Sequence, residues 1–195
     1  MKTISLVYIS LSGNTESFVT RLKDYLLSQY KGIEVQKIHI KDLVKEGKNF
    51  YEMDHPYVAF LPTYLEGGNG VDNGDVEILT TPVGDFIAYG NNASKCFGVV
   101  GSGNRNFNNQ YCLTAKQYSQ RFGFPVLADF EMRGMLEDIK HVAAIIADLY
   151  ELEKEMSYST KIKEQTRKLT KEQTRKLVAG CSKHSFEVAD RADVV

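Results

Sequence analysis

The sequence predicts an α/β protein with a doubly wound, five-stranded parallel sheet, strand order 2-1-3-4-5, and helices on both faces. Short, nearly continuous apolar runs recur along the chain, and helical patterns lie between them. Such runs are typical of strands buried on both faces, and strands that alternate with helices indicate a parallel sheet. Five strands within about 150 residues, joined by right-handed crossovers, favour a small fold that binds its ligand where the strand order reverses.

Each expected strand is an apolar run that ends near a turn or a breaker residue. The five runs are residues 4–9, 35–40, 57–61, 97–101 and 125–130. The second is only half apolar, with Val35, Ile38 and Ile40 as its apolar positions, so we expect it to be half-buried. Three helices are expected: one with Phe18, Val19, Leu22 and Leu26 on one face, one near residues 110–122, and one near 138–155.

The charge of the chain divides unevenly, and this division predicts two parts. Residues 1–155 carry 15 basic against 20 acidic residues, whereas residues 156–195 carry 9 against 5. We therefore expect one domain over 1–155 and a basic helical or disordered tail over 156–195. Within this tail residues 163–169 recur as 171–177, which suits either a solvated helix or a basic docking arm. The acidic body argues against nucleic acid as a partner.

Several other functions are disfavoured by what the chain contains. No run approaches 18 uncharged apolar residues, so no membrane span is expected. The first nine residues indicate a strand rather than a signal peptide, and we expect a cytoplasmic protein. Cys96, Cys112 and Cys181 lie far apart, which predicts inert thiols rather than a disulfide framework or a zinc site. The four histidines are isolated, so no side-chain catalyst and no metal site is expected.

The first candidate binding loop follows the first expected strand and opens a helix. It holds Ser10, Ser12, Gly13, Asn14 and Thr15, with no lysine or arginine. The opening N–H groups of a helix are unpaired and partly positive, so glycine and short hydroxyls there suit a phosphate. Neutral donors favour a monophosphate ester such as that of FMN over a triphosphate. The alternative is an ordinary helix N-cap.

Two further loops share this glycine, hydroxyl and amide composition, each directly after a strand. The candidate residues of the first are Pro62, Thr63, Tyr64, Gly67 and Gly68, and those of the second are Ser102, Gly103, Asn104, Asn106 and Phe107. Tyr64 could stack on a flat ring, Phe107 could offer a second apolar surface, and glycine peptides could face a ring nitrogen. Each loop alone could be an ordinary turn, but the three together favour a binding site.

Other phosphate motifs fail when they are compared with the sequence. The G-x-x-x-x-G-K-[ST] loop is absent, and a dinucleotide G-x-G-x-x-G would need glycine where Asn106 stands. A phosphatase loop needs arginine six residues after a cysteine, but Ser102 and Tyr118 occupy those positions. A receiver-type acidic cluster is missing, because the first strand leads into Ser10 and the third into Pro62.

The loop residues also carry a family resemblance. The Ser10–Thr15 segment is similar to the phosphate loop of flavodoxins. Together with residues 62–64, 101–107 and 130–134 it resembles NrdI, the flavodoxin-like family that accompanies class Ib ribonucleotide reductase. The resemblance covers about residues 2–152, and its most specific motif is 102–107. It implies a flavodoxin-like fold that binds FMN.

The resemblance further implies a redox role carried by the cofactor rather than by side chains. Members help to assemble or maintain the dimanganese–tyrosyl radical cofactor of the reductase, through an oxidant made from O₂ at reduced FMN. The implied partners are the small subunit of the class Ib reductase, an electron-donor flavoprotein or reductase, and O₂. A general electron-transfer flavodoxin and a flavin-free NrdI-like binding module are the alternatives.

The chain departs from the family pattern after residue 64. Leu65 and Glu66 stand where an almost all-glycine loop is usual, and Asp72, Asp75 and Glu77 follow. Negative charge close to a flavin would disfavour its anionic reduced forms, so these carboxylates are expected to matter if they face the ring. Met135 stands where a small polar residue is expected.

Overall fold

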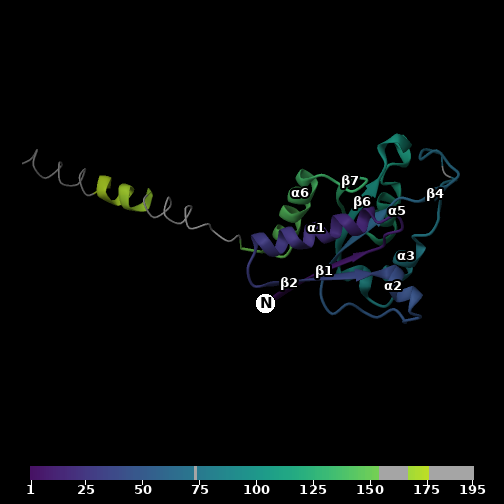
Figure 1. The fold of residues 1–195 in the computed structure, drawn as a ribbon, viewed down its shortest axis with the longest axis horizontal. Coiled ribbons are helices and arrows are strands. Elements are labelled where there is room, and N and C mark those ends of the chain that lie inside the picture. Colours follow the sequence, from purple (N-terminus) through teal and green to yellow (C-terminus); the bar gives the residue numbers. More distant parts are fainter. Residues whose placement is uncertain (73, 154–166, 176–195) are drawn as a thin grey trace, which may run out of the picture. The chain divides into compact units, whose positions relative to one another are not determined.

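The computed structural model describes residues 1–72, 74–153 and 167–175. A five-stranded parallel sheet forms the centre of the part that precedes residue 154 (Figure 1). The strands are β1 (Lys2–Tyr8), β2 (Ile33–His39), β3 (Tyr57–Pro62), β6 (Cys96–Gly103) and β7 (Val126–Glu131). Their order is β2-β1-β3-β6-β7, so the predicted order 2-1-3-4-5 is confirmed. The strand β4 (Leu65–Glu66) pairs with β5 (Val76–Glu77) in a separate two-stranded hairpin.

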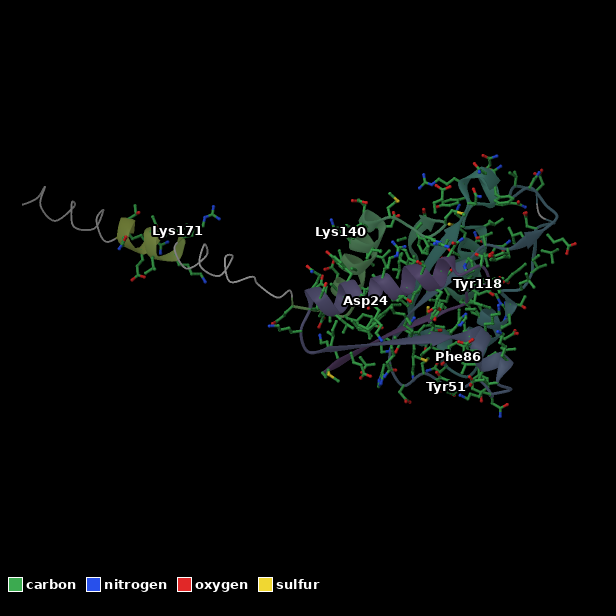
Figure 2. The ribbon with its side chains drawn as sticks, in the orientation of Figure 1. Asp24, Tyr51, Phe86, Tyr118, Lys140 and Lys171 are labelled. Carbon is green, nitrogen blue, oxygen red and sulfur yellow. The ribbon has the colours of Figure 1, made fainter. Side chains whose placement is uncertain are left out.

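Helices cover the sheet on both faces. The first face carries α1 (Asn14–Gln29) and α6 (Leu136–Leu149), which pack against each other. The second carries α2 (Ile40–Lys45), α3 (Thr81–Ala88) and α5 (Leu113–Phe122), with the short α4 (Asn92–Lys95) before β6. Figure 2 shows Asp24 and Lys140, both exposed, on α1 and α6, whereas the labelled Phe86 and Tyr118 are buried.

The sheet separates two hydrophobic cores, and β3 contributes to both because all six of its residues are buried. On the first face Phe18 stacks on Phe130 with ring centroids 3.7 Å apart, and Phe60 packs beside Phe18. On the second face Tyr57 meets Phe86 edge to face at 6.3 Å. Apolar side chains on both sides of a central strand explain why its sequence is one unbroken apolar run.

The structure differs from the predicted elements at four places, three of which precede the last helix. Ile40 does not extend the second strand but opens α2 as a buried residue, directly after His39, which pairs with Asp42 in the first turn of that helix. Helix α3 was not predicted; a proline in its first turn opens it, consistent with the fixed φ of that ring. The helix near 110–122 begins only at Leu113, after the 3₁₀ turn η1 (Arg105–Gln110).

The last predicted helix starts and ends earlier than expected. It runs from Leu136 to Leu149, not from 138 to 155. Its end is fixed by Tyr150, whose hydroxyl donates to the Pro56 carbonyl oxygen at 2.7 Å and whose ring packs edge to face on Phe97. The chain then leaves the helical path, since Glu151 has a φ of +49°.

The chain divides into two compact units, Met1–Lys154 and Glu155–Val195. In the second unit residues 167–175 form an exposed helix, and the other residues of the expected tail lie outside the described part. Among the described residues no helix is long and apolar enough to cross a bilayer.

Gly134 allows us to test the packing of the first core. Its φ is +65°, and an added Cβ would lie 2.6 Å from a ring carbon of Phe18, which is fully buried and cannot move aside. Gly123 has a similar φ of +82° but open space around it. We expect Gly123→Ala to lower the free energy of unfolding by about 1 kcal/mol and Gly134→Ala by about 3 kcal/mol, measured by urea denaturation. Equal losses would show that the contact with Phe18 is unimportant.

Candidate functional site

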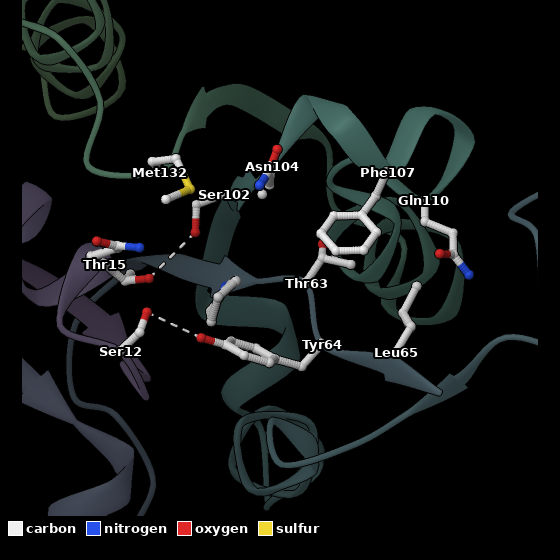
Figure 3. Close-up of a pocket in the computed structure, with 13 residues that line it drawn as sticks. Ser12, Thr15, Thr63, Tyr64, Leu65, Ser102, Asn104, Phe107, Gln110 and Met132 are labelled. Atoms are coloured by element: carbon white, nitrogen blue, oxygen red, sulfur yellow. Dashed lines mark hydrogen bonds between the residues drawn. The ribbon is translucent and has the colours of Figure 1, made fainter. Parts of the chain in front are cut away.

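A cavity of about 250 Å³ lies at the carboxyl ends of β1, β3 and β6 (Figure 3). The segments that follow these three strands, the three loops singled out in the sequence, all contribute to its lining. Parallel strands end at the same edge of a sheet, so adjacent strands bring their loops together there. The arrangement is therefore a direct result of the strand order.

The first loop joins β1 to α1. Some of its polar residues line the cavity, and another supports the loop from within. Ser12, Asn14 and Thr15 line the cavity. Ser10 is buried and does not line it; its Oγ accepts a hydrogen bond from the Glu16 amide at 3.2 Å. Gly13 also lies outside the lining, and as the residue before α1 it takes the left-handed conformation at φ +82°. These two predicted residues shape the loop.

The start of α1 is open to a ligand. The residue before the helix is Gly13, which has no side chain to cap it. The first amides of any helix also lack partners inside the helix. The Glu16 amide is satisfied by Ser10, and the Ser17 amide donates to the Gly13 carbonyl oxygen. Asn14 and Thr15, whose amides open the helix, both line the cavity.

The second loop supplies Pro62, Thr63 and Tyr64 to the cavity wall. The Tyr64 hydroxyl donates to Ser12 Oγ at 3.2 Å, which ties this loop to the first (Figure 3). Thr63 Oγ1 is buried but has no hydrogen-bond partner. Buried polar atoms are normally paired, and among the described residues Thr63 is the one of four residues with an unpaired buried hydroxyl that lines the cavity.

Gly67 and Gly68 do not line the cavity, although they were predicted to. Both have positive φ, and a Cβ on Gly68 would overlap the Asp75 carboxylate at 2.2 Å. Asp75 accepts from the Gly70 amide at 3.0 and 3.1 Å, while the Gly67 carbonyl oxygen accepts from Gln110. These glycines therefore serve the fold of the hairpin loop.

The acidic residues of this loop do not line the cavity either. Asp72 accepts from the Asn69 side-chain amide, and Asp75 is bound within the loop. Glu77 accepts from the Tyr118 hydroxyl at 2.8 Å and from Thr80. The three carboxylates are thus engaged by partners of their own rather than turned towards the cavity.

The third loop follows β6 and contributes Ser102, Gly103, Asn104 and Phe107. Ser102 is buried, and its Oγ lies 3.3 Å from Thr15 Oγ1, a hydrogen bond that joins the third loop to the first (Figure 3). Asn104 Oδ1 accepts from the Asn106 amide at 2.9 Å. Asn106 itself, also predicted as a site residue, is exposed outside the lining, so its part is to close this turn.

Three lining residues were missed from the sequence: Leu65, Gln110 and Met132. Gln110 reaches from the third loop to the second, where its side-chain amide donates to Gly67 and to Asp75. Nothing local in the sequence distinguishes it. Met132 lies inside the 130–134 motif of the resemblance, so a signal for it existed. Its φ is +53°, and its amide donates to the Gly103 carbonyl oxygen at 2.9 Å.

The histidines are not all isolated, contrary to expectation. His39 Nδ1 lies 2.9 Å from Asp42 Oδ2, and the Ser10 amide donates to His39 Nε2 at 3.1 Å. Neither contact reaches the cavity lining. Among the described residues no group of three or more histidine, cysteine or acidic side chains could hold a metal ion.

The family profile described as NrdI flavodoxin-like matches residues 6–144, most of the part that forms the sheet and the cavity. The chain belongs to the NrdI flavodoxin-like family. It is 99% identical over 155 residues to an NrdI-like protein of Streptococcus pneumoniae, a match that covers 80% of this chain and 99% of that protein. An NrdI-like protein of Streptococcus pyogenes serotype M1 is 60% identical over 148 residues, 76% of this chain and 90% of that protein.

More distant relatives carry the family name itself. Protein NrdI of Rhodococcus jostii is 34% identical over 148 residues, covering 75% of this chain and 85% of that protein. Among solved structures, a short-chain flavodoxin associated with a bacterial microcompartment aligns with a TM-score of 0.55 at 19% identity, over 77% of this chain and 98% of that one. Oxidised flavodoxin 2 of Bacillus cereus aligns with a TM-score of 0.50 at 18% identity, over 76% of this chain and 99% of that one. These two likenesses establish the flavodoxin-like fold.

Membership of the NrdI family implies FMN as the cofactor, and the cavity residues fit this group. The helix start offers amides, and Ser12, Thr15 and Thr63 offer hydroxyls, of which the last is unpaired. None of the described side chains that line the cavity is charged, which suits a phosphate bound by neutral donors. Tyr64 and Phe107 supply aromatic surface for a flat ring.

The two described cysteines allow a chemical test of this part of the fold. Burial raises the pKa of the Cys96 and Cys112 thiols to about 12, so both are protonated at neutral pH. Because the thiolate is the nucleophile, we expect iodoacetamide to modify both at least about a hundredfold more slowly in the native protein than in urea. Peptide mass spectrometry follows each cysteine separately. Equal native and unfolded rates at either one would contradict its burial.

Proposed function

We propose that this chain binds FMN in the cavity and acts as the flavoprotein that helps to build or maintain the dimanganese–tyrosyl radical cofactor of a class Ib ribonucleotide reductase. The observation that carries the proposal is the meeting of the three loops around a cavity with an unpaired hydroxyl, in a chain of the NrdI family. We assign the binding to the domain of residues 1–155.

The phosphate of FMN would lie at the start of α1. Ser12, Asn14 and Thr15 are the cavity residues of this loop, and their backbone and side-chain donors face a region where the helix dipole favours an anion. The hydrogen bond between Thr15 and Ser102 and the one that Tyr64 donates to Ser12 hold the loop in place before a ligand arrives. A preformed loop binds with less loss of conformational entropy.

The flavin ring would lie between the second and third loops. Tyr64 and Phe107 provide aromatic surface, and Thr63 Oγ1 provides an unused polar group for a ring heteroatom. Phe107 is 62% exposed and Met132 48%, so the mouth of the cavity is apolar and open to solvent. FMN supplies one- and two-electron redox chemistry and reaction with O₂, and the protein holds it and controls access.

The open mouth also suits contact with partners. O₂ and a protein electron donor need an accessible ring edge, and the reductase small subunit needs a surface next to it. The exposed side chains of Phe107 and Met132 lie at this edge of the cavity. We propose this edge as the side on which the small subunit and the electron-donor flavoprotein or reductase meet the chain.

A pair of substitutions at Gly13 tests the placement of the phosphate. Asparagine and aspartate have the same shape and both tolerate the positive φ of this residue, and an added Cβ meets no atom within 4 Å. Only aspartate places a negative charge beside the phosphate. We expect Gly13→Asp to bind FMN at least about tenfold more weakly than Gly13→Asn, measured by flavin fluorescence titration. Equal affinities would mean that the phosphate lies elsewhere.

The role itself is tested with the reductase. The FMN-loaded chain is reduced without oxygen, mixed with the manganese-loaded small subunit of a class Ib reductase, and exposed to O₂. We expect a tyrosyl radical signal by electron paramagnetic resonance that needs both the chain and FMN. A protein that remains colourless after FMN is added would favour the flavin-free module. A yellow, reducible protein that gives no radical would favour a general electron carrier.

A further inference from the structure

His39 lies behind the phosphate loop, outside the cavity lining. It is the last residue of β2, and its ring stacks on Tyr8 of β1 with centroids 4.7 Å apart and planes 5° from parallel. Its side chain is 17% exposed. From this position its Nε2 accepts the hydrogen bond of the Ser10 amide at 3.1 Å. A histidine from the neighbouring strand thus holds the first residue of the loop.

The two hydrogen bonds fix the protonation state of this imidazole. Nε2 can accept an N–H only if it carries no proton, so the proton of the neutral ring lies on Nδ1 and is donated to Asp42 Oδ2 at 2.9 Å. A doubly protonated ring would place an N–H against the N–H of Ser10. Only neutral His39 is compatible with the loop in its present conformation.

Ser10 transmits this contact to the helix start. Its amide is held by His39, and its Oγ accepts from the Glu16 amide in the first turn of α1. The segment between these two points contains Ser12, Asn14 and Thr15, which line the cavity. Release of Ser10 would therefore loosen the loop at the end opposite to the Thr15–Ser102 hydrogen bond.

The charges around His39 come from three other positions. Asp42 on α2 pairs with it directly. Lys37 of β2 lies over the Tyr8 ring, on which His39 stacks, with its Nζ 5.9 Å from the ring centroid. Lys37 is in turn paired with Glu16 of α1 at 2.7 Å. Burial raises the pKa of Glu16, but hydrogen bonds from Lys37 and Tyr8 outweigh it, so the net pKa is lowered and Glu16 stays ionised.

We propose that His39 is a positioning residue for the phosphate loop: the neutral imidazole holds the Ser10 amide, and protonation releases it and weakens binding of FMN. The inference rests on the proposed function only in taking FMN as the ligand. Protonated His39 would also attract the phosphate, but its charge is paired with Asp42 and its side chain does not line the cavity. Loss of the hydrogen bond therefore prevails, and affinity falls with falling pH.

The test compares two variants with the native chain. His39→Gln provides a carbonyl oxygen that can accept from Ser10 but does not titrate, and His39→Phe keeps a ring against Tyr8 without an acceptor. His141→Gln, at an exposed histidine on α6, is the control. FMN takes up a proton of its own near pH 6, so the quantity compared is the ratio of two dissociation constants at the same pH, in which that proton cancels.

We expect the native chain and His39→Gln to bind FMN equally at about pH 8, and the native chain to bind about fivefold more weakly than His39→Gln at about pH 5.5. His39→Phe should bind about fivefold more weakly than His39→Gln at about pH 8. His141→Gln should match the native chain throughout. The proposal would be overturned if the ratio of the two dissociation constants, native chain to His39→Gln, did not change with pH. It would also be overturned if the native chain bound FMN more tightly than His39→Gln at low pH.

A second measurement needs no FMN. In the free protein, the ¹⁵N and ¹H shifts of the Ser10 amide should titrate together with the His39 ring nitrogens, and should not titrate in His39→Gln. If the Ser10 amide shifts do not change as His39 ionises, the inference is contradicted even if FMN binds. A titrating amide in a protein that never binds FMN would leave the positioning role intact and overturn the proposed function instead.

Discussion

The parallel pairing of β3 with β1 on one side and β6 on the other is the constraint on which the site depends. Tyr8 is in register with Phe60, and Pro62 with Ser102, so β1, β3 and β6 end at nearly the same level of the sheet. Burial of all six β3 residues between two cores fixes this register, because a shift of one residue would exchange the side chains of the two faces. The position of the cavity therefore follows from hydrophobic packing on the two faces of the sheet.

The residues that were predictable from the sequence are those whose local pattern has one physical meaning. The apolar runs at residues 57–61 and 97–101 are typical of strands buried on both faces, and the turns after neighbouring parallel strands share one edge of the sheet. Lining residues such as Ser12, Thr63 and Ser102 follow from that logic. Ile40 was misplaced because a β-branched residue after alternating apolar positions fits a strand equally well, and the His39–Asp42 contact is invisible to periodicity.

Residue type alone could not distinguish residues that line the cavity from residues that hold the loops in shape. Ser10 and Ser12 are the same amino acid two positions apart, yet one holds a helix amide and the other lines the cavity. Gly67 and Gly68 have the freedom expected of ligand-facing peptides, but use it to fold around Asp75. Gln110 is the reverse case, a residue without local signal whose long side chain meets the second loop only after the chain has folded. These distinctions depend on distances between segments far apart in the sequence.

The left-handed backbone at Met132 has a consequence of its own. A glycine would adopt φ +53° more easily, yet the chain keeps there an unbranched thioether, whose three rotatable bonds adapt to whatever lies beside it. Its amide is bonded to Gly103, so it lies next to Ser102, whose hydroxyl pairs with that of Thr15 (Figure 3). Both hydroxyls are buried and belong to regular structure, β6 and α1. An adaptable thioether therefore lies directly beside a rigid pair of hydroxyls. At this point of the wall the hydroxyl pair can fix the position of a bound group, while the thioether adjusts to the shape of that group.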